Sequence, residues 1–131
     1  MMARISFDES STPPSAALLA EMPAGIRVPA KLFEELARCL RFPDYFGANW
    51  NALEECIRDL SWLPAGTVVL KHHDLPLVGD VASQKVYLSI LRDAAERRWT
   101  LQGQHLRDLL VVFPSEVRDQ VAWLLRSVDS E

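Results

Sequence analysis

Apolar residues recur along the chain at two spacings, and each spacing predicts a different kind of element. Short apolar runs predict buried strands at residues 66–72 and 108–113, and a weaker alternation predicts a first strand at residues 3–8. Elsewhere the apolar positions recur about every three or four residues, as on one face of a helix. This second pattern predicts helices at residues 15–22, 29–40, 50–61, 81–98 and 116–131.

The ends of these helices carry local signals. Pro23 ends the first helix, and Pro29 suits the first turn of the second because it has no backbone N–H to leave unpaired. Asn49, Asp80 and Ser115 precede the next three helices, where a side-chain oxygen can accept a hydrogen bond from the helix N-terminus. The sequence therefore predicts a side-chain cap at each of these three positions.

The apolar stripes of the helices predict which residues face a core. The inward positions are Leu32, Phe33, Leu36, Cys39 and Leu40 in the second helix, Val86, Tyr87, Ile90, Leu91 and Ala94 in the fourth, and Val117, Val121, Leu124, Leu125 and Val128 in the last. We expect the last stripe to pack on the domain, with self-association as the alternative.

The order of the elements predicts the fold class. Short apolar strands separated by helices favour parallel pairing, because parallel strands need a crossover connection. We expect an α/β fold in which a three-stranded parallel sheet is packed by helices. The 131 residues form one domain, with a core over about residues 3–115 and an added C-terminal helix over residues 116–131.

Composition places the chain among ordinary globular proteins. It is 49% hydrophobic, and no apolar run approaches the roughly 18–20 residues of a membrane span. The N-terminal residues lack the apolar stretch of a signal peptide, so a cytoplasmic location is expected. Cys39 and Cys56 occupy apolar helix positions and are expected to be buried free thiols. Neither a metal site nor a cofactor is predicted.

The negative charge is concentrated in one part of the chain. Residues 42–80 contain six acidic and two basic residues, a balance of −4 that equals the net charge of the whole protein. Without a basic stripe, direct binding of nucleic acid is not expected. An acidic surface can attract a basic partner, and a solvated surface with no partner is the alternative.

The predicted helix at residues 50–61 carries much of this charge. On a helical wheel its apolar side contains Leu53, Cys56, Ile57 and Leu60, and its polar side contains Asn51, Glu54, Glu55 and Arg58. The polar side must face water or a partner. Local ion pairing between Arg58 and the two glutamates would also explain the pattern.

The loop before this helix is rich in aromatic residues. Phe46 and Trp50 are expected to fill core, whereas Tyr45 is expected to be exposed and to serve as an interface anchor beside the acids. Gly47 is expected to supply a positive φ where the loop turns into the helix. The loop and the helix together form the candidate binding element.

The segment P-D-Y-F-G-A-N-W-N-A-L-E-E-C, residues 43–56, resembles the signature of the barstar family, intracellular inhibitors of secreted bacterial ribonucleases. The resemblance implies a three-stranded parallel sheet packed by helices. It also implies that this loop and the following helix bind in the active site of a ribonuclease and block it. It implies that Tyr45 contacts the catalytic groups of the nuclease and that Glu55 takes the position of a central aspartate in the phosphate pocket. Asn51 takes the position of another interface aspartate, and Asp93 falls on an acidic rim position.

The sequence also departs from the family pattern. Asn51 has lost a charge, Glu55 is one methylene longer than aspartate, and Glu54 stands where the founding member of the family has an aromatic residue. Residues 10–27 are expected to be an insertion. The partner-binding set is Asp44, Tyr45, Gly47, Asn51, Glu54, Glu55, Asp59 and Asp93.

We expect a binding protein, monomeric when free, with no enzymatic activity and no membrane association. Its expected partner is a basic ribonuclease or related nuclease toxin, and the alternative is a basic partner that is not a nuclease. A third hypothesis, a small hydrolase using His72, His73 and Asp74, is disfavoured because neighbouring residues on a strand point to opposite faces.

Overall fold

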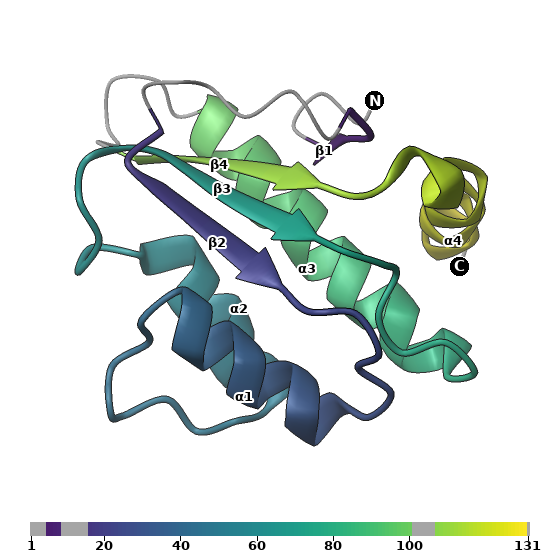
Figure 1. Ribbon diagram of the computed structural model, residues 1–131, viewed down its shortest axis with the longest axis horizontal. Helices are drawn as coiled ribbons and strands as arrows, with labels where there is room; N and C mark the ends of the chain where they lie inside the picture. The colour runs from purple at the N-terminus through teal and green to yellow at the C-terminus, as the bar shows by residue number, and fades with distance from the viewer. Residues whose placement is uncertain (1–4, 9–15, 101–106, 131) are drawn as a thin grey trace.

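The computed structural model describes residues 5–8, 16–100 and 107–130, and for residues 97–100 it describes the backbone alone. Within these residues the protein has one sheet of four parallel strands in the order β1-β4-β3-β2 (Figure 1). The strands are β1 (Ile5–Ser6), β2 (Leu18–Met22), β3 (Gly66–His72) and β4 (Arg107–Val112).

Helices connect and cover these strands. They are α1 (Pro29–Cys39), α2 (Trp50–Asp59), α3 (Val81–Thr100), the 3-10 turn η1 (Ser115–Val117) and α4 (Arg118–Asp129). In Figure 1, α3 runs behind the sheet, α1 and α2 lie on the β2 side, and α4 lies beyond the end of β4. The predicted fold class, a parallel α/β sheet packed by helices with an additional C-terminal helix, is confirmed.

The number of strands differs from the prediction. Residues 18–22, expected to be helical and to belong to an insertion, form β2 and pair in parallel with β3 from Leu18 opposite Val68 to Met22 opposite His72. Ala20 and Met22 point into the core, whereas Leu19 and Glu21 stay exposed. Pairing with β3 overrides the helical preference of leucine, alanine and glutamate in so short a segment.

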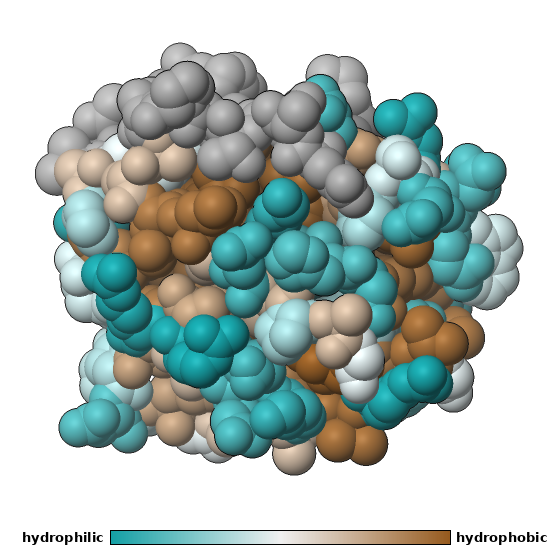
Figure 2. Space-filling view, viewed as in Figure 1, coloured by the Kyte–Doolittle hydropathy of each residue, from teal (hydrophilic) through white to brown (hydrophobic). Residues whose placement is uncertain are grey.

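The core lies between the helices and one face of the sheet. It combines Leu70 of β3 and Val111 of β4 with Leu36 of α1, Ile57 of α2 and Leu91 of α3, all of which are fully buried. On the opposite face, visible in Figure 2, hydrophobic surface over the strands lies beside hydrophilic surface.

In α3 the predicted stripe needs one correction. Tyr87, Ile90, Leu91 and Ala94 are buried as predicted, but Val86 is exposed. The reason is that α3 contacts both the sheet and α4, so its buried face includes Leu88 and is rotated away from Val86.

Two of the three predicted helix caps are present. The Asn49 side chain accepts a hydrogen bond from Ala52 N at 2.8 Å, and Asp80 Oδ1 accepts one from Ser83 N at 3.1 Å. Ser115 is not the cap of α4, because η1 intervenes and α4 begins only at Arg118.

The C-terminal helix packs on the domain, as expected. Val121, Leu124 and Leu125 are buried against the core cluster, and α4 contacts α3. Val117 and Val128, predicted in the same stripe, remain partly exposed. None of the described helices combines the length and apolar character needed to cross a bilayer.

Candidate functional site

Aromatic packing fixes the loop that precedes α2. Phe42 and Phe46 contact each other edge to face with ring centroids 4.8 Å apart, and Trp50 packs edge to face on Phe33 of α1 at 4.9 Å. Phe42 also meets Trp62, whose indole Nε1 donates a hydrogen bond to Leu40 O at 2.9 Å. The loop is therefore held from both sides, by α1 and by the segment after α2. The sequence does not predict that Phe33 and Trp62 support the loop, because both residues lie outside the motif at residues 43–56.

Tyr45 is the exception among the aromatic residues of this segment. Its side chain is 72% exposed, as predicted, while Phe42, Phe46 and Trp50 pack against the core. Local desolvation of the phenol raises the pKa of Tyr45, and the negative charges of Cys56, Asp59 and Glu55 raise it further. The hydroxyl of Tyr45 thus lies within electrostatic reach of carboxylates on α2.

The turn into α2 uses a different residue from the one predicted. Gly47 does not have a positive φ; the neighbouring Ala48 does, with a φ of 51°. A Cβ at Gly47 would instead make a tight contact, 3.3 Å from Asn49 Nδ2, so a larger residue there would push on the Asn49 side chain. Asn49 Nδ2 also donates to Gly47 O at 3.3 Å, so this glycine leaves room for the cap of α2.

Replacing Ala48 by glycine tests this geometry. A non-glycine residue with a left-handed conformation is strained by roughly 1–2 kcal/mol, so we expect Ala48→Gly to raise the free energy of unfolding by about 0.5–1 kcal/mol. Urea unfolding followed by circular dichroism measures it. Ala65 is exposed and its φ is not positive, so Ala65→Gly is the matched control and should destabilise slightly. Equal losses of stability in both variants would contradict the assignment.

The exposed face of α2 carries the predicted acids. Leu53, Cys56 and Ile57 are buried, whereas the polar residues of the helix point outward. The exposed residues are Asn51, Glu54, Glu55, Arg58 and Asp59. Glu54 is engaged within the helix by Arg58 at 3.5 Å. No ion pair joins Asp44, Glu55 or Asp59 to any other residue that the structure describes.

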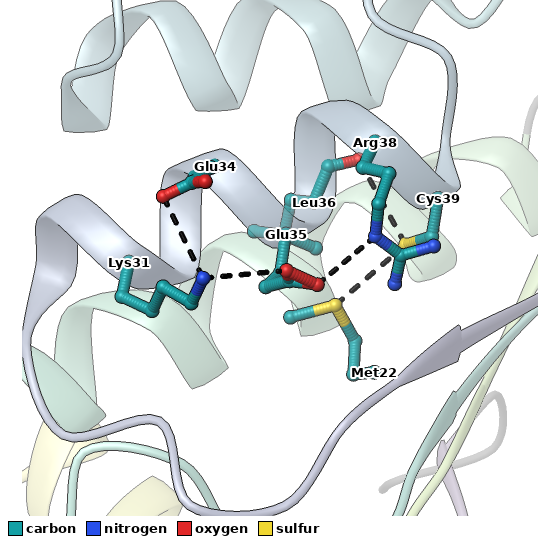
Figure 3. Close-up of polar contacts among 7 residues, drawn as sticks. All are labelled: Met22, Lys31, Glu34, Glu35, Leu36, Arg38 and Cys39. Carbon is teal, nitrogen blue, oxygen red and sulfur yellow. Dashed lines mark hydrogen bonds and ion pairs between the residues drawn. The ribbon is translucent and has the colours of Figure 1, made fainter.

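The charges of the neighbouring helix are arranged differently (Figure 3). In α1, Lys31 lies 3.7 Å from both Glu34 and Glu35, and Arg38 pairs with Glu35 at 3.0 Å. The acids of α1 are therefore matched by bases on the same helix. In α2 and its loop, three carboxylates around Tyr45 are not, which leaves this surface with unbalanced negative charge. We call the surface formed by Asp44, Tyr45, Glu55 and Asp59 the acidic face.

Asp93, predicted as a rim residue, lies in a groove that none of the acidic-face residues lines. It is exposed on α3, lies 3.7 Å from Arg92, and contributes to a groove of about 480 Å³ between α3 and α4. Arg92 in turn pairs with Asp129 of α4 at 3.0 Å. The surroundings of Asp93 thus include the added helix as well as α3.

The three polar residues at the end of β3 do not converge. His72 is buried and contacts Val112 O and the Tyr87 hydroxyl, whereas His73 contacts Glu21 at 3.2 Å. Asp74 accepts a hydrogen bond from Gly25 N at 2.9 Å. The structure therefore offers no arrangement of these side chains for hydrolysis. In the described part of the chain, no group of His, Cys, Asp and Glu side chains could hold a metal ion.

Both cysteines are free thiols, as predicted. Cys56 is buried, and Cys39 is partly buried with its Sγ 3.6 Å from Met22 Sδ of β2 (Figure 3). Burial raises the pKa of Cys39 to about 11, with a smaller opposing effect of Arg38. The Cys39 thiol is accordingly protonated at neutral pH and packs as an apolar group.

Fold and surface together define a small parallel α/β protein with an exposed tyrosine beside an acidic helix. A sequence profile described as Barstar (barnase inhibitor) matches residues 23–113. No curated protein gives a significant match. Because the profile covers more than half of the chain, this protein belongs to the barstar family. The matched range contains α1, the aromatic loop, α2, β3, α3 and β4, and it confirms the resemblance seen in residues 43–56.

Proposed function

We propose that this protein inhibits a bacterial ribonuclease toxin by placing the acidic face in its active site. The observation that carries the proposal is the aromatic support of the loop, which leaves Tyr45 exposed beside carboxylates that form no ion pair with any described residue. Membership of a family described by barnase inhibition supports a ribonuclease as the partner. In this proposal the chain contributes no catalytic group and acts by occupying the site.

The chemistry of the expected partner explains why carboxylates suit this task. A ribonuclease must stabilise an anionic phosphodiester, so its active site collects cationic donors. Glu55 projects from a helix that is anchored through Leu53, Cys56 and Ile57, which fixes the position of its carboxylate. A carboxylate in that position can pair with an arginine through two parallel hydrogen bonds and so replace the phosphate.

A second candidate function keeps the same surface and changes the partner. Asn51 carries no charge, and Glu54 is engaged by Arg58 at 3.5 Å, so the centre of the helix offers less free negative charge than the sequence alone indicates. These features favour a basic protein that is not a nuclease as the alternative. Such a partner would bind the acidic face through the same Tyr45, Glu55 and Asp59.

The direct test is inhibition of RNA cleavage. The purified protein is added in increasing amounts to a barnase-type ribonuclease, and cleavage of a fluorogenic RNA substrate is followed. The proposal predicts stoichiometric inhibition, and it predicts that phosphate-rich polyanions displace the protein from the ribonuclease in a binding assay. Absence of inhibition across a panel of such ribonucleases, with tight binding to another basic protein, would favour the alternative.

Asp59→Asn tests whether the acidic face steers association. Asp59 is exposed at the end of α2, and its removal should slow association with a basic partner and weaken binding by about 1 kcal/mol at low salt. Stopped-flow mixing at two ionic strengths measures the effect. Asp119→Asn is the matched control, because Asp119 is an exposed acid in the first turn of α4. Equal slowing by both variants would show that only net charge matters.

A further inference from the structure

A second concave surface lies at the end of the molecule where β3 enters α3. The loop at residues 73–80, the first turn of α3 and the residues after β4 surround a pocket of about 470 Å³. This volume falls within the roughly 300–1,000 Å³ of small-molecule sites. The pocket contains none of the residues of the acidic face, so it is independent of the proposed nuclease inhibition.

The walls of this pocket are mostly aliphatic. Leu75, Val78, Val81 and Val117 line it, and Val78 and Val81 are 56% and 42% exposed. Figure 2 shows hydrophobic surface over this loop and the start of α3. Aliphatic side chains that remain exposed around a concavity favour a ligand with an apolar body.

Two polar side chains of the pocket, Asp74 and Gln84, differ in their hydrogen bonding. Asp74 Oδ2 accepts from Gly25 N at 2.9 Å, but its Oδ1 is buried and has no hydrogen-bond partner among the described residues. Gln84 is buried with its Nε2 donating to Pro76 O at 3.0 Å, so its amide orientation is fixed. A buried acceptor left without a donor is rare in folded proteins and costly, which makes Asp74 Oδ1 a position that favours a donor.

The charge of the pocket decides what kind of donor fits. Apart from the groups already named, Gly79 and Gln120 complete the lining, which includes no lysine, arginine or histidine among the residues that the structure describes. The N-terminus of α3 would oppose a cation, but Asp80 caps it, and its hydrogen bonds to Ser83 lower the pKa of Asp80 and keep it ionised. The described lining of the pocket therefore has one carboxylate, Asp74, and no basic side chain.

We propose that this pocket binds a small organic cation, with a guanidinium or ammonium group directed at Asp74 and a short aliphatic chain among the valines. In this proposal the groups that cover Asp74 Oδ1 move enough for the ligand to reach this buried oxygen, while Oδ2 keeps its bond to Gly25 N. The aliphatic chain contributes by removing apolar surface from water, and the cation contributes a charge-assisted hydrogen bond.

The test is a titration of the full ¹⁵N-labelled chain with n-butylguanidinium, followed by amide chemical shifts. The expected result is saturable shifts in residues 73–80 and at Gln84, with affinity at least about tenfold higher than for neutral n-butylurea. Pentanoate, with an opposite charge on a similar chain, should not bind. Asp74→Asn keeps an acceptor for Gly25 N and should lower the affinity for n-butylguanidinium about tenfold.

Two controls make the outcome decisive. Val81→Lys places an ammonium group at the exposed rim of the pocket and should abolish binding of the cation without touching Asp74. Glu55→Gln, a substitution on the acidic face, should leave the affinity of the pocket for n-butylguanidinium unchanged. No saturable shifts, equal binding of pentanoate, or undiminished binding by Asp74→Asn would each overturn the proposal, whether or not the protein inhibits a ribonuclease.

Discussion

Glu55→Lys is expected to weaken the complex with the partner ribonuclease by about 2–5 kcal/mol, because it replaces a carboxylate inside a cationic site by a like charge. The loss should appear mainly as faster dissociation, since contacts made only in the docked complex control that rate. In the free protein Glu55 is exposed and has no ion pair with any described residue, so the substitution should leave folding nearly unchanged. Surface plasmon resonance gives both rate constants, and thermal unfolding checks the fold.

The matched control for this prediction is Glu116→Lys. Glu116 is an exposed acid in η1, outside the acidic face, so the same reversal of charge is made away from the proposed contact. We expect only a modest, salt-dependent slowing of association there. A dissociation constant unaffected by Glu55→Lys, or equally affected by both variants, would remove Glu55 from the binding site.

His72 is expected to make the stability of the protein depend on pH. The imidazole is fully buried, stacks on Phe113 with ring centroids 4.1 Å apart, and contacts Val112 O at 3.1 Å and the Tyr87 hydroxyl at 2.6 Å. Because Val112 O can only accept, Nδ1 carries the proton and Nε2 accepts from Tyr87. If the ring gained a second proton, Nε2 would become a donor. The Tyr87 hydroxyl, which donates to Nε2 in the neutral state, would then have to reorient its hydrogen in order to accept.

The sign of the effect follows from this geometry. Burial lowers the pKa of His72 from 6.5 to about 4, partly offset by the hydrogen bond to Val112 and reinforced by the nearby His73. The contribution of His72 to the free energy of unfolding is fully present above pH 6.5, where its imidazole is neutral in the unfolded chain as well. This contribution is lost as the pH falls towards 4, because only the unfolded chain then takes up the proton. The slope reaches about 1.4 kcal/mol per pH unit, for a total of about 3 kcal/mol.

Urea unfolding at several pH values between 5 and 7 measures this slope. His72→Gln removes the titrating group and should flatten the dependence, even if the variant is less stable at every pH. His73→Gln is the matched control, since the His73 side chain is 47% exposed and, among the described residues, forms a polar contact only with Glu21. A His72→Gln variant that keeps the slope of the wild type would show that other groups cause it.

The parts of the fold that sequence predicts are those specified by local pattern. Strands β3 and β4 and helices α1 to α3 follow from apolar runs and stripes, and Asn49 and Asp80 cap their helices because a cap depends on residues three positions away. The exposure of Tyr45 is predicted from its chemistry, because a tyrosine beside acidic residues suits an interface anchor.

The parts that escape prediction depend on contacts distant in sequence. The five residues of β2 are mostly good helix formers, and only their pairing with β3 makes them a strand. The positive φ of Ala48 carries no signal in the sequence, because the adjacent Gly47 is the residue type that ordinarily adopts such an angle. The setting of Asp93 depends on how α4 packs on α3, which the spacing of charges on α3 does not reveal.

The aromatic support beneath Tyr45 separates two tasks within one short segment. The contacts of Phe33, Phe42 and Trp62 hold the backbone of the loop. The residues proposed to contact a partner, such as Tyr45, lie on the exposed side and take no part in these contacts. Little ordering entropy remains to be lost on docking, so tight association is compatible with a modest number of contacts. Substitutions among the outer residues can consequently redirect recognition toward new targets over evolutionary time, with the underlying architecture left intact.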